Sequence, residues 1–516
     1  MPEPSPTPTT QPAGVLDRRQ THLIFGGMLL ATFLSSLDGT AVATALPTMA
    51  GELGGLDQLP WVLTAYLLGS VAATPLYGKL SDLYGRRALT QTALIVFIVS
   101  SVLCAMAQSM LQLVLARGVQ GIGGGGLMAM GFIVIGDIFS PRERGRYMAF
   151  YTMNFSLSSI AGPVIGGVFV EVSSWRWIFL INVPLGLVAL AVIQRHLTFR
   201  LPPRSHRLDL VGSALLVAAT TSLIVGLSIV DGDRSWSSPL VVGLLVGAVV
   251  GTVAFVAWER RAPEPVLPMR LFGNPTFRIL ILGNVIYGLA AMGVMAYFPL
   301  FFQVSLGESP TRAGLIIAST TVFVTVGSYI AGRLTTGTGR YLGILRVAPA
   351  LSAVSLCLFL LIDRGDSALA AIPLLALMGL SMGMAFPTMT TATQNSLELP
   401  DLGAGTAAIN FFRTLGQTLG VGGFGALLAA RISGDLDGLA AAEEAGLDPA
   451  ELLSTPEDIA ALDPGLRAAV EEAVAGATHG IFWVAVPVMV VMVVAVWFLP
   501  ELELRTTTAL AAQSDE

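Results

Sequence analysis

The feature that most constrains this chain is a long series of apolar runs. A helix needs about 20 apolar residues to cross roughly 30 Å of hydrocarbon, and runs of that length recur through most of the sequence. We count fourteen, centred near Leu34, Leu68, Ile95, Gly124, Ser158, Gly186, Ala218, Gly247, Tyr287, Phe323, Leu356, Met382, Gly420 and Val490. Because helices satisfy their own backbone hydrogen bonds in lipid, the sequence predicts an all-α membrane protein with 14 transmembrane helices.

Composition excludes several classes of function. The chain is 54% hydrophobic and only 12% charged, and its mean hydropathy is +0.74, so it has too little polar surface for a soluble globule. Cys104 and Cys357 lie in apolar runs and indicate neither a disulfide nor a metal site. The glycines of 121–126 are not followed by the Gly-Lys-Ser/Thr of a phosphate-binding loop. We expect no enzyme, metal, cofactor or nucleic-acid partner.

Charge along the chain predicts its orientation. Of the 28 Lys and Arg residues, twenty fall in segments on the side of the N-terminus, six on the opposite side, and Arg117 and Arg413 within runs. Short cytoplasmic loops hold the Lys and Arg excess, so both termini are expected in the cytoplasm of a multi-pass protein of the cell membrane. The net charge of −6 arises from one segment, with eleven acids between Arg431 and His479, which is expected outside the cell.

An internal repeat divides the chain. The segment 78–86 recurs at 332–340, an offset of 254, and Asn154 with the glycines 166–167 recurs at Asn410 with 422–423, an offset of 256. Two matches at nearly one offset indicate duplicated halves. The predicted domains are a disordered cytoplasmic tail 1–20, an N-terminal six-helix bundle 21–200, two inserted transmembrane helices 201–262, a C-terminal six-helix bundle 263–500 with an acidic extracytoplasmic loop 432–478, and a cytoplasmic tail 501–516.

Asp38 is the first candidate functional residue, because a carboxylate in hydrocarbon costs roughly 2.5–3.5 kcal/mol. Asp38 precedes Pro47 by nine residues and Arg117 follows Ser109 by eight, which places both about 12–13 Å below the outer surface at 1.5 Å per residue. The matched depth predicts a charge pair across a cavity, which protonation of Asp38 would break. Two alternatives stay open: a purely structural pair, and an Asp38 that acts as counter-ion to a cationic substrate.

Two glycine-containing segments are candidates for moving parts. Asp82 and Arg86 lie four residues apart, on one face if the helix continues, while Gly78 and Gly85 permit close approach and a tight turn. In the second copy of this segment Thr336 replaces Asp82. The fifth run contains a cluster that thins and kinks one helix at the interface between the halves, formed by Gly162, Pro163, Gly166 and Gly167. Alternatively, the arginines only set topology and the small residues only allow packing.

The C-terminal half has no acid at mid-depth, so the chain relies on Asp38 alone. Arg413 lies about two turns inside its run, where it either snorkels to the cytoplasm or lines the cavity. Candidate cavity residues are Asn154, Asn284, Tyr287, Asn410, Arg413 and Gln417. An adaptable apolar wall is expected from Met292, Met295, Phe298, Phe301, Phe302, Met382, Met384 and Phe386.

Five segments in order resemble those of the fourteen-span drug/proton antiporters of the major facilitator superfamily: 37–40 continuing to 45–47, 78–87, 117–121, 162–167 and 175–184. The resemblance covers the whole membrane body. It implies the major facilitator fold, two pseudo-repeated six-helix bundles plus two inserted helices. It also implies a cytoplasmic latch in which Arg86 meets Asp137 while Asp82 faces a helix N-terminus of the other half, and it assigns the fifth-run cluster to an antiporter motif.

These observations predict a proton-coupled antiporter that exports lipophilic, cationic or neutral drugs by alternating access. Its partners are small lipophilic molecules, protons and membrane lipids, the proton gradient supplies the energy, and a monomer is expected to function. The alternative within transport is a dedicated exporter of one endogenous metabolite, antibiotic, siderophore or lipid precursor. A non-transporting scaffold or sensor is a third reading, against which the charged residues at matching depth argue.

Overall fold

The computed structural model describes residues 17–54, 58–197, 209–229, 236–363, 366–398, 401–436 and 464–504. All regular structure in these ranges is helical. The N-terminal half consists of α1 (Arg18–Leu53), α2 (Leu59–Tyr84), α3 (Arg86–Ala105), α4 (Met110–Ile138), α5 (Pro141–Val172), α6 (Arg176–Leu180) and α7 (Asn182–His196). Two further helices follow, α8 (Leu210–Ser228) and α9 (Pro239–Glu259).

The C-terminal half begins with the 3-10 helix η2 (Met269–Gly273) and a segmented passage through α10 (Pro275–Ile286), η3 (Tyr287–Met292), α11 (Gly293–Met295), α12 (Phe298–Leu300) and η4 (Phe301–Ser305), in which η3 and η4 are π-helical. It continues with α13 (Pro310–Thr338), α14 (Leu342–Phe359), η5 (Ala368–Ala370), α15 (Ala371–Ser396), α16 (Leu402–Leu436), α20 (Pro464–Ala495) and η7 (Val496–Phe498). The ends of the predicted loop 432–478 therefore belong to α16 and α20, because apolar helices run on past the point where their acidic neighbours begin. The rest of that loop and most of both predicted tails lie outside the described residues.

Local sequence accounts for several helix starts. Ser140 and Glu143 form a capping box before α5, Asn274 accepts hydrogen bonds from the first turn of α10, and Ser309 caps α13. Such caps satisfy amides that the helix itself leaves unpaired. Proline follows each of these caps at the first helical position, where its missing amide hydrogen costs nothing.

Twelve passages in the described residues are long and apolar enough to span a membrane. The helices α2 and α16 are 26 and 35 residues long and lie in the bundle beside them, but they carry more polar side chains and are not among the twelve. Hydropathy alone therefore supports twelve of the fourteen predicted spans. The two more polar helices pack against each other where the halves meet.

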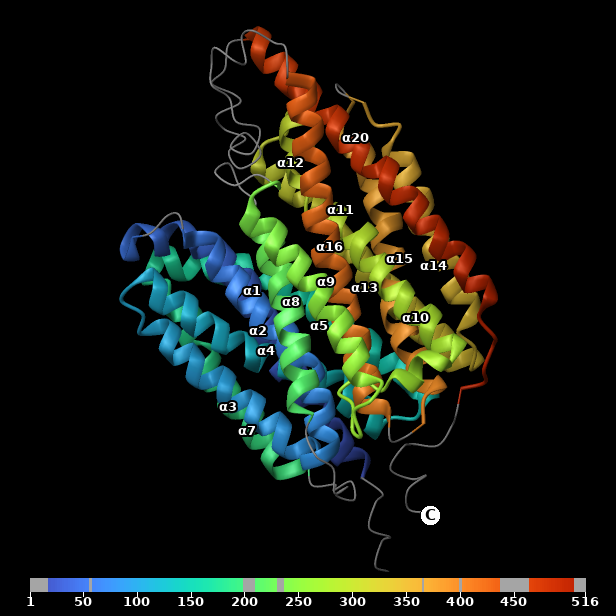
Figure 1. The fold of residues 1–516 in the computed structure, drawn as a ribbon. Coiled ribbons are helices and arrows are strands. Elements are labelled where there is room, and N and C mark those ends of the chain that lie inside the picture. Colours follow the sequence, from blue (N-terminus) through green and yellow to red (C-terminus); the bar gives the residue numbers. More distant parts are fainter. Residues whose placement is uncertain are drawn as a thin grey trace, which may run out of the picture.

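Figure 1 shows two helical bundles side by side, with α8 and α9 in front of the seam between them. Within the first half, α4 packs against α2 and α3, and α1 packs against α5 and α7. Within the second, α15 packs against α13 and α14, and α16 against α20. The most extensive contacts between the halves are those of α2 with α16 and of α5 with α13, and α5 with α15 and α4 with α16 add further contacts, while α8 also contacts α2 and α16. The inserted pair thus borders the seam.

The closest contacts between the halves gather at one face of the molecule, which we call the closed face. There a Cβ on Gly78 would lie 3.0 Å from the carbonyl oxygen of Gly403, and a Cβ on Gly332 would lie 2.6 Å from that of Gly145. The first residues of α1, α5 and α16 lie at this face, and so does the C-terminal segment at Glu503. Toward the opposite face the ribbons of the two halves diverge (Figure 1).

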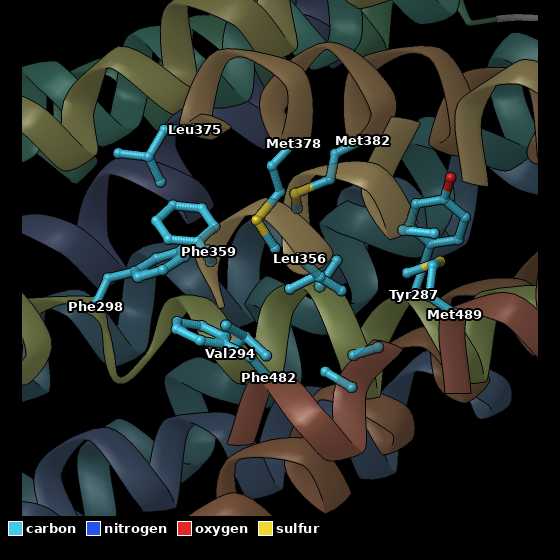
Figure 2. Close-up of a cluster of buried hydrophobic side chains, with 14 of the residues drawn as sticks. Tyr287, Val294, Phe298, Leu356, Phe359, Leu375, Met378, Met382, Phe482 and Met489 are labelled. Atoms are coloured by element: carbon cyan, nitrogen blue, oxygen red, sulfur yellow. The ribbon is translucent and has the colours of Figure 1, made fainter. Parts of the chain in front are cut away.

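Methionine and phenylalanine side chains fill the centre of the C-terminal half. Figure 2 shows Phe298, Phe359 and Phe482 together with Met378 and Met382 in one buried cluster. The expectation of an adaptable cavity wall is therefore wrong for its buried members, Phe298, Phe301, Phe302, Met382 and Met384. Helix faces inside one bundle and helix faces toward a cavity are both apolar, so composition alone does not separate them.

Candidate proton and substrate site

Asp38 on α1 and Arg117 on α4 form a fully buried ion pair through Arg117 Nη1 and Asp38 Oδ2. The other carboxylate oxygen, Oδ1, accepts hydrogen bonds from Gln120 Nε2 at 2.9 Å and from Asn182 Nδ2 at 3.0 Å. Asn182 is the first residue of α7, so one carboxylate ties together three helices. Hydrogen bonds to an ionised carboxylate are stronger than neutral ones.

The surroundings of Arg117 extend this network. The Arg117 guanidinium carbon lies 4.3 Å from the ring centroid of Tyr66 on α2, and its Nε donates to the Val62 carbonyl at 3.4 Å. Gln120 and Asn182 both donate to Ser101 of α3, at 2.8 and 3.3 Å. A single charge pair is thus held by five helices of the N-terminal half.

The predicted pairing of Asp38 and Arg117 is present, but the predicted placement across a cavity is wrong. Both side chains have 0% exposure and lie inside one bundle. Spacing along the sequence gives the depth of Asp38 and Arg117 in the membrane. The direction in which each side chain points around its helix depends on neighbouring helices, which a single sequence does not reveal. Gln120 and Asn182 were not predicted as site residues, although Gln120 follows Arg117 by three residues on one helix face.

The predicted latch is assembled at the closed face. Arg86 Nε donates to Asp137 Oδ2 at 2.7 Å, and Arg86 Nη1 lies 2.5 Å from Asp82 Oδ1. Asp82 in turn faces the first turn of α16, since a Cβ on Gly403 would lie 2.6 Å from Asp82 Oδ2. The turn between α2 and α3 is made by Gly85 at φ 89°, a backbone conformation that favours glycine. The charged cluster joins α2, α3 and α4 to the other half.

The second copy of this segment meets the opposite half in the same way. Its Gly332 packs against Gly145 near the start of α5, and the Thr336 carbonyl accepts a hydrogen bond from Arg142 Nε at 3.1 Å. A backbone contact therefore stands where the first copy has the carboxylate of Asp82. Each copy of the duplicated segment thus contacts a helix of the opposite half, one through Gly78 and Gly403 and the other through Gly332 and Gly145. We call these two contacts the docking pairs.

The predicted antiporter cluster faces the interior of its own half. A Cβ on Gly162 would lie 2.7 Å from the Thr40 Cβ, and one on Gly166 would lie 2.7 Å from the Ala41 carbonyl oxygen, so α5 packs tightly on α1 through these glycines. Nothing lies within 4 Å of a Cβ on Gly167. Pro163 is inside α5. The expected contact between the halves is instead made by Gly145, nearer the start of the same helix, because the thin face points toward α1.

The six candidate cavity residues fall into three groups. Asn284 is buried and bonds to its own helix at Leu280, and Tyr287 is buried with its hydroxyl 3.1 Å from Ser381 Oγ. These two belong to the core of the C-terminal half, contrary to expectation. The half-buried Asn154 links α5 to α1 through the Leu29 carbonyl at 3.0 Å. On α16, Arg413 lies at the seam with Asn410, which accepts a hydrogen bond from it, and Gln417 follows Arg413 by four residues on the same helix.

Arg413 reaches the opposite half. Its guanidinium carbon lies 5.8 Å from the ring centroid of Phe132 on α4 and 5.2 Å from that of Phe386 on α15. Its Nη2 donates to Asn410 Oδ1 at 2.7 Å. Nearer the closed face, Gln394 Nε2 donates to the Phe132 carbonyl at 3.3 Å and so bridges the halves. Arg413 therefore faces the seam between the halves, and its role in lining a substrate cavity stays a prediction.

An apolar cavity of about 480 Å³ lies on the other side of α16, against the inserted helices. It is lined by Leu216, Leu223, Phe255, Met269, Phe411 and Leu415, with Arg260 at its border. Its size falls within the range of roughly 300–1,000 Å³ usual for small-molecule sites. Within the described residues, no cluster of three or more metal-ligating side chains is present.

Comparison with known proteins places this architecture. The sequence model of the Major Facilitator Superfamily matches residues 28–421. Multidrug transporter protein MdtP of Bacillus subtilis is 38% identical over 80% of this chain and 76% of its own length. Multidrug resistance protein 3 of the same organism is 30% identical over 96% of this chain and 98% of its own length.

Solved structures agree on the fold. The proton:xylose symporter XylE superposes with a TM-score of 0.61 at 14% identity, covering 96% of this chain and 99% of its own. The human organic anion transporter MFSD10 superposes with a TM-score of 0.58 at 16% identity, covering 92% and 99%. With its two helical halves, its duplicated docking segments and these matches, the chain is a multi-span membrane protein that belongs to the Major Facilitator Superfamily.

Proposed function

We propose that this protein exports lipophilic small molecules across the cell membrane in exchange for protons, by alternating access. Export is supported by relatives named as multidrug transporters and efflux pumps. Proton coupling is supported by one observation above others, the buried pair of Asp38 and Arg117. The proton gradient then supplies the energy, and a monomer in contact with membrane lipids suffices.

The pair has the properties of a two-state element. Protonation of Asp38 would neutralise the carboxylate and leave the Arg117 charge buried without a counter-charge. Removing one partner of a buried pair costs roughly 3–5 kcal/mol, which is enough to shift an equilibrium between two arrangements of the helices. Because Gln120 and Asn182 bind the same carboxylate, α1, α4 and α7 would respond together.

The conformation seen in the structure corresponds to one end state of an alternating-access transporter, in which one side of the seam is closed. If both termini lie in the cytoplasm, as the arginine distribution predicts, the closed face is cytoplasmic and the state is outward-open. The Arg86 cluster and the two glycine docking pairs then hold the cytoplasmic side shut. Opening that side requires the Gly78–Gly403 and Gly145–Gly332 contacts to separate, and protonation of Asp38 is the event that biases this change.

Transport driven by an imposed gradient tests the proposal. Purified protein in liposomes, given a lipophilic fluorescent dye and a pH gradient, should move the dye against its concentration in exchange for protons. The Asp38→Asn variant should bind dye but lose gradient-driven movement, whereas Glu52→Gln, at an acid on the outer end of α1, should retain it. A rate of dye transport by the wild type that is the same with and without the pH gradient would contradict proton coupling.

The range of exported compounds distinguishes a broad exporter from a dedicated exporter of one compound. Cells that express the chain should accumulate less of several unrelated lipophilic compounds than cells with an empty vector. Reduced accumulation of a single compound would favour the dedicated exporter of one endogenous metabolite, antibiotic, siderophore or lipid precursor. Unchanged accumulation of every compound would favour the scaffold or sensor.

A further inference from the structure

The seam between the halves carries a cation that has no acidic partner. Arg413 is eleven residues beyond the first residue of α16, about 16 Å along the helix. Among the described residues it takes part in no ion pair, in contrast with Arg86 and Arg117, whose carboxylates lie in direct contact. An ionisable group at that depth is expensive and marks a functional site.

The protein satisfies this guanidinium only in part. It has five N–H donors, and the one hydrogen bond described for it goes to Asn410 Oδ1. The rings of Phe132 and Phe386 offset some of the charge through cation–π contacts, but aromatic carbon supplies no oxygen acceptor. The side chain is only half-buried, so its remaining donors border accessible space at the seam.

Phe132 and Phe386, one from each half, flank the Arg413 guanidinium, and each ring packs on a tyrosine of its own half. Phe132 lies 4.4 Å from Tyr151 between ring centroids, and Phe386 lies 5.7 Å from Tyr287. A flat, apolar molecule would find apolar contacts against these rings, and the charged group that lies beside them is the Arg413 guanidinium. Asp38, which was the alternative counter-ion for a cationic substrate, is enclosed within the N-terminal half.

We propose that Arg413 is the anion-binding group of the substrate site, and that the exported lipophilic compounds carry a carboxylate, sulfonate or phosphate. The planar guanidinium suits such groups because it donates two parallel hydrogen bonds to a pair of oxygens. The inference rests on the proposed export function and deepens it, since it assigns acidic substrates where cationic or neutral ones were expected. Asn410 holds the guanidinium in place.

Equilibrium binding with matched probes tests the assignment. Pyrenebutyrate, its methyl ester and pyrenebutylamine share one apolar body and differ in charge, and their binding to purified protein at pH 7.5 can be followed by pyrene fluorescence. The wild type should bind the butyrate at least tenfold more tightly than the ester, as expected for charge-assisted hydrogen bonds. Arg413→Gln should lose that preference and leave ester binding within about twofold, while Arg413→Lys should keep part of it.

Arg346→Gln is the matched control, because Arg346 also stacks on an aromatic ring, that of Trp497 at 4.5 Å, but away from the seam. It should leave all three affinities unchanged. Equal binding of butyrate and ester by the wild type, no butyrate binding at all, or an equal loss of all three probes in both Arg413 variants would overturn the proposal. The assay needs no proton gradient, so a butyrate preference that survives a failure of gradient-driven transport would remove the coupling mechanism and leave the anion site intact.

Discussion

Replacing the charged side chains of Asp38 and Arg117 one at a time and then together measures the coupling energy between them. Arg117→Met leaves a buried carboxylate held only by Gln120 and Asn182, and Asp38→Leu leaves a buried guanidinium over Tyr66. Each single change should lower the free energy of unfolding by roughly 3–5 kcal/mol, because it strands a charge. The double variant removes both charges and should lose only about 2 kcal/mol or less.

The two single losses together then exceed the double loss by about 4 kcal/mol or more, and this excess is the coupling energy of the pair. Titration of the protein in detergent with SDS, followed by circular dichroism, gives the free energies. The outer pair of Arg176 and Glu52, 2.9 Å apart with about half of the Glu52 side chain exposed, is the control and should couple by only about 0–1 kcal/mol. Single losses at Asp38 and Arg117 that simply add, within about 0.5 kcal/mol, would refute the two-state role.

Three further outcomes are expected. Gly403→Leu should open the closed face, since its side chain meets Asp82, and should raise labelling of cysteines placed in the seam, whereas normal labelling would contradict the docking pair. Hydrogen bonds from Trp175 and Arg176 lower the pKa of Glu52, so its contribution to stability is full above the ordinary carboxyl pKa and is lost as the pH falls below it. The difference in melting temperature between wild type and Glu52→Gln should therefore stay constant above about pH 5 and shrink below about pH 4.3. A cysteine at Ala442, outside the described residues, should react with impermeant reagent from outside cells, and reaction only from the cytoplasm would reverse the predicted orientation.

Sequence reasoning reached the fold because its signals are periodic or repeated. Apolar runs of membrane-spanning length need no tertiary information, and the echo of 78–86 at 332–340 became the pair of docking segments that close the seam. The turn at Gly85 and the Arg86–Asp137 contact were also predicted, the contact by resemblance alone. The turn depends on neighbouring residues only, and the Arg86–Asp137 contact is implied by the order of the motifs that resemble the family.

The site was predicted less completely because it depends on rotation about helix axes. Depth along the helix identified Asp38 and Arg117 as partners, yet gave no indication that both point into one bundle. Asn182 lies 144 residues from Asp38, and no local pattern connects them. Tyr287 and Asn284 read as cavity residues because they are polar in an apolar run, although hydrogen bonds within the C-terminal core already satisfy the Tyr287 hydroxyl and the Asn284 amide nitrogen. Arg413 and Phe386 were both identified as candidates, but their contact with each other and the contact of Arg413 with Phe132 of the other half were not.

The central claim is that the Asp38 carboxylate binds the transported proton. It is tested most directly by proton release from purified protein on addition of substrate. Weakly buffered wild-type protein with a pH indicator should release protons when a transported dye binds, and Asp38→Asn should bind the dye and release none. Proton release from Asp38→Asn equal to that of the wild type would contradict the account and assign coupling to another group.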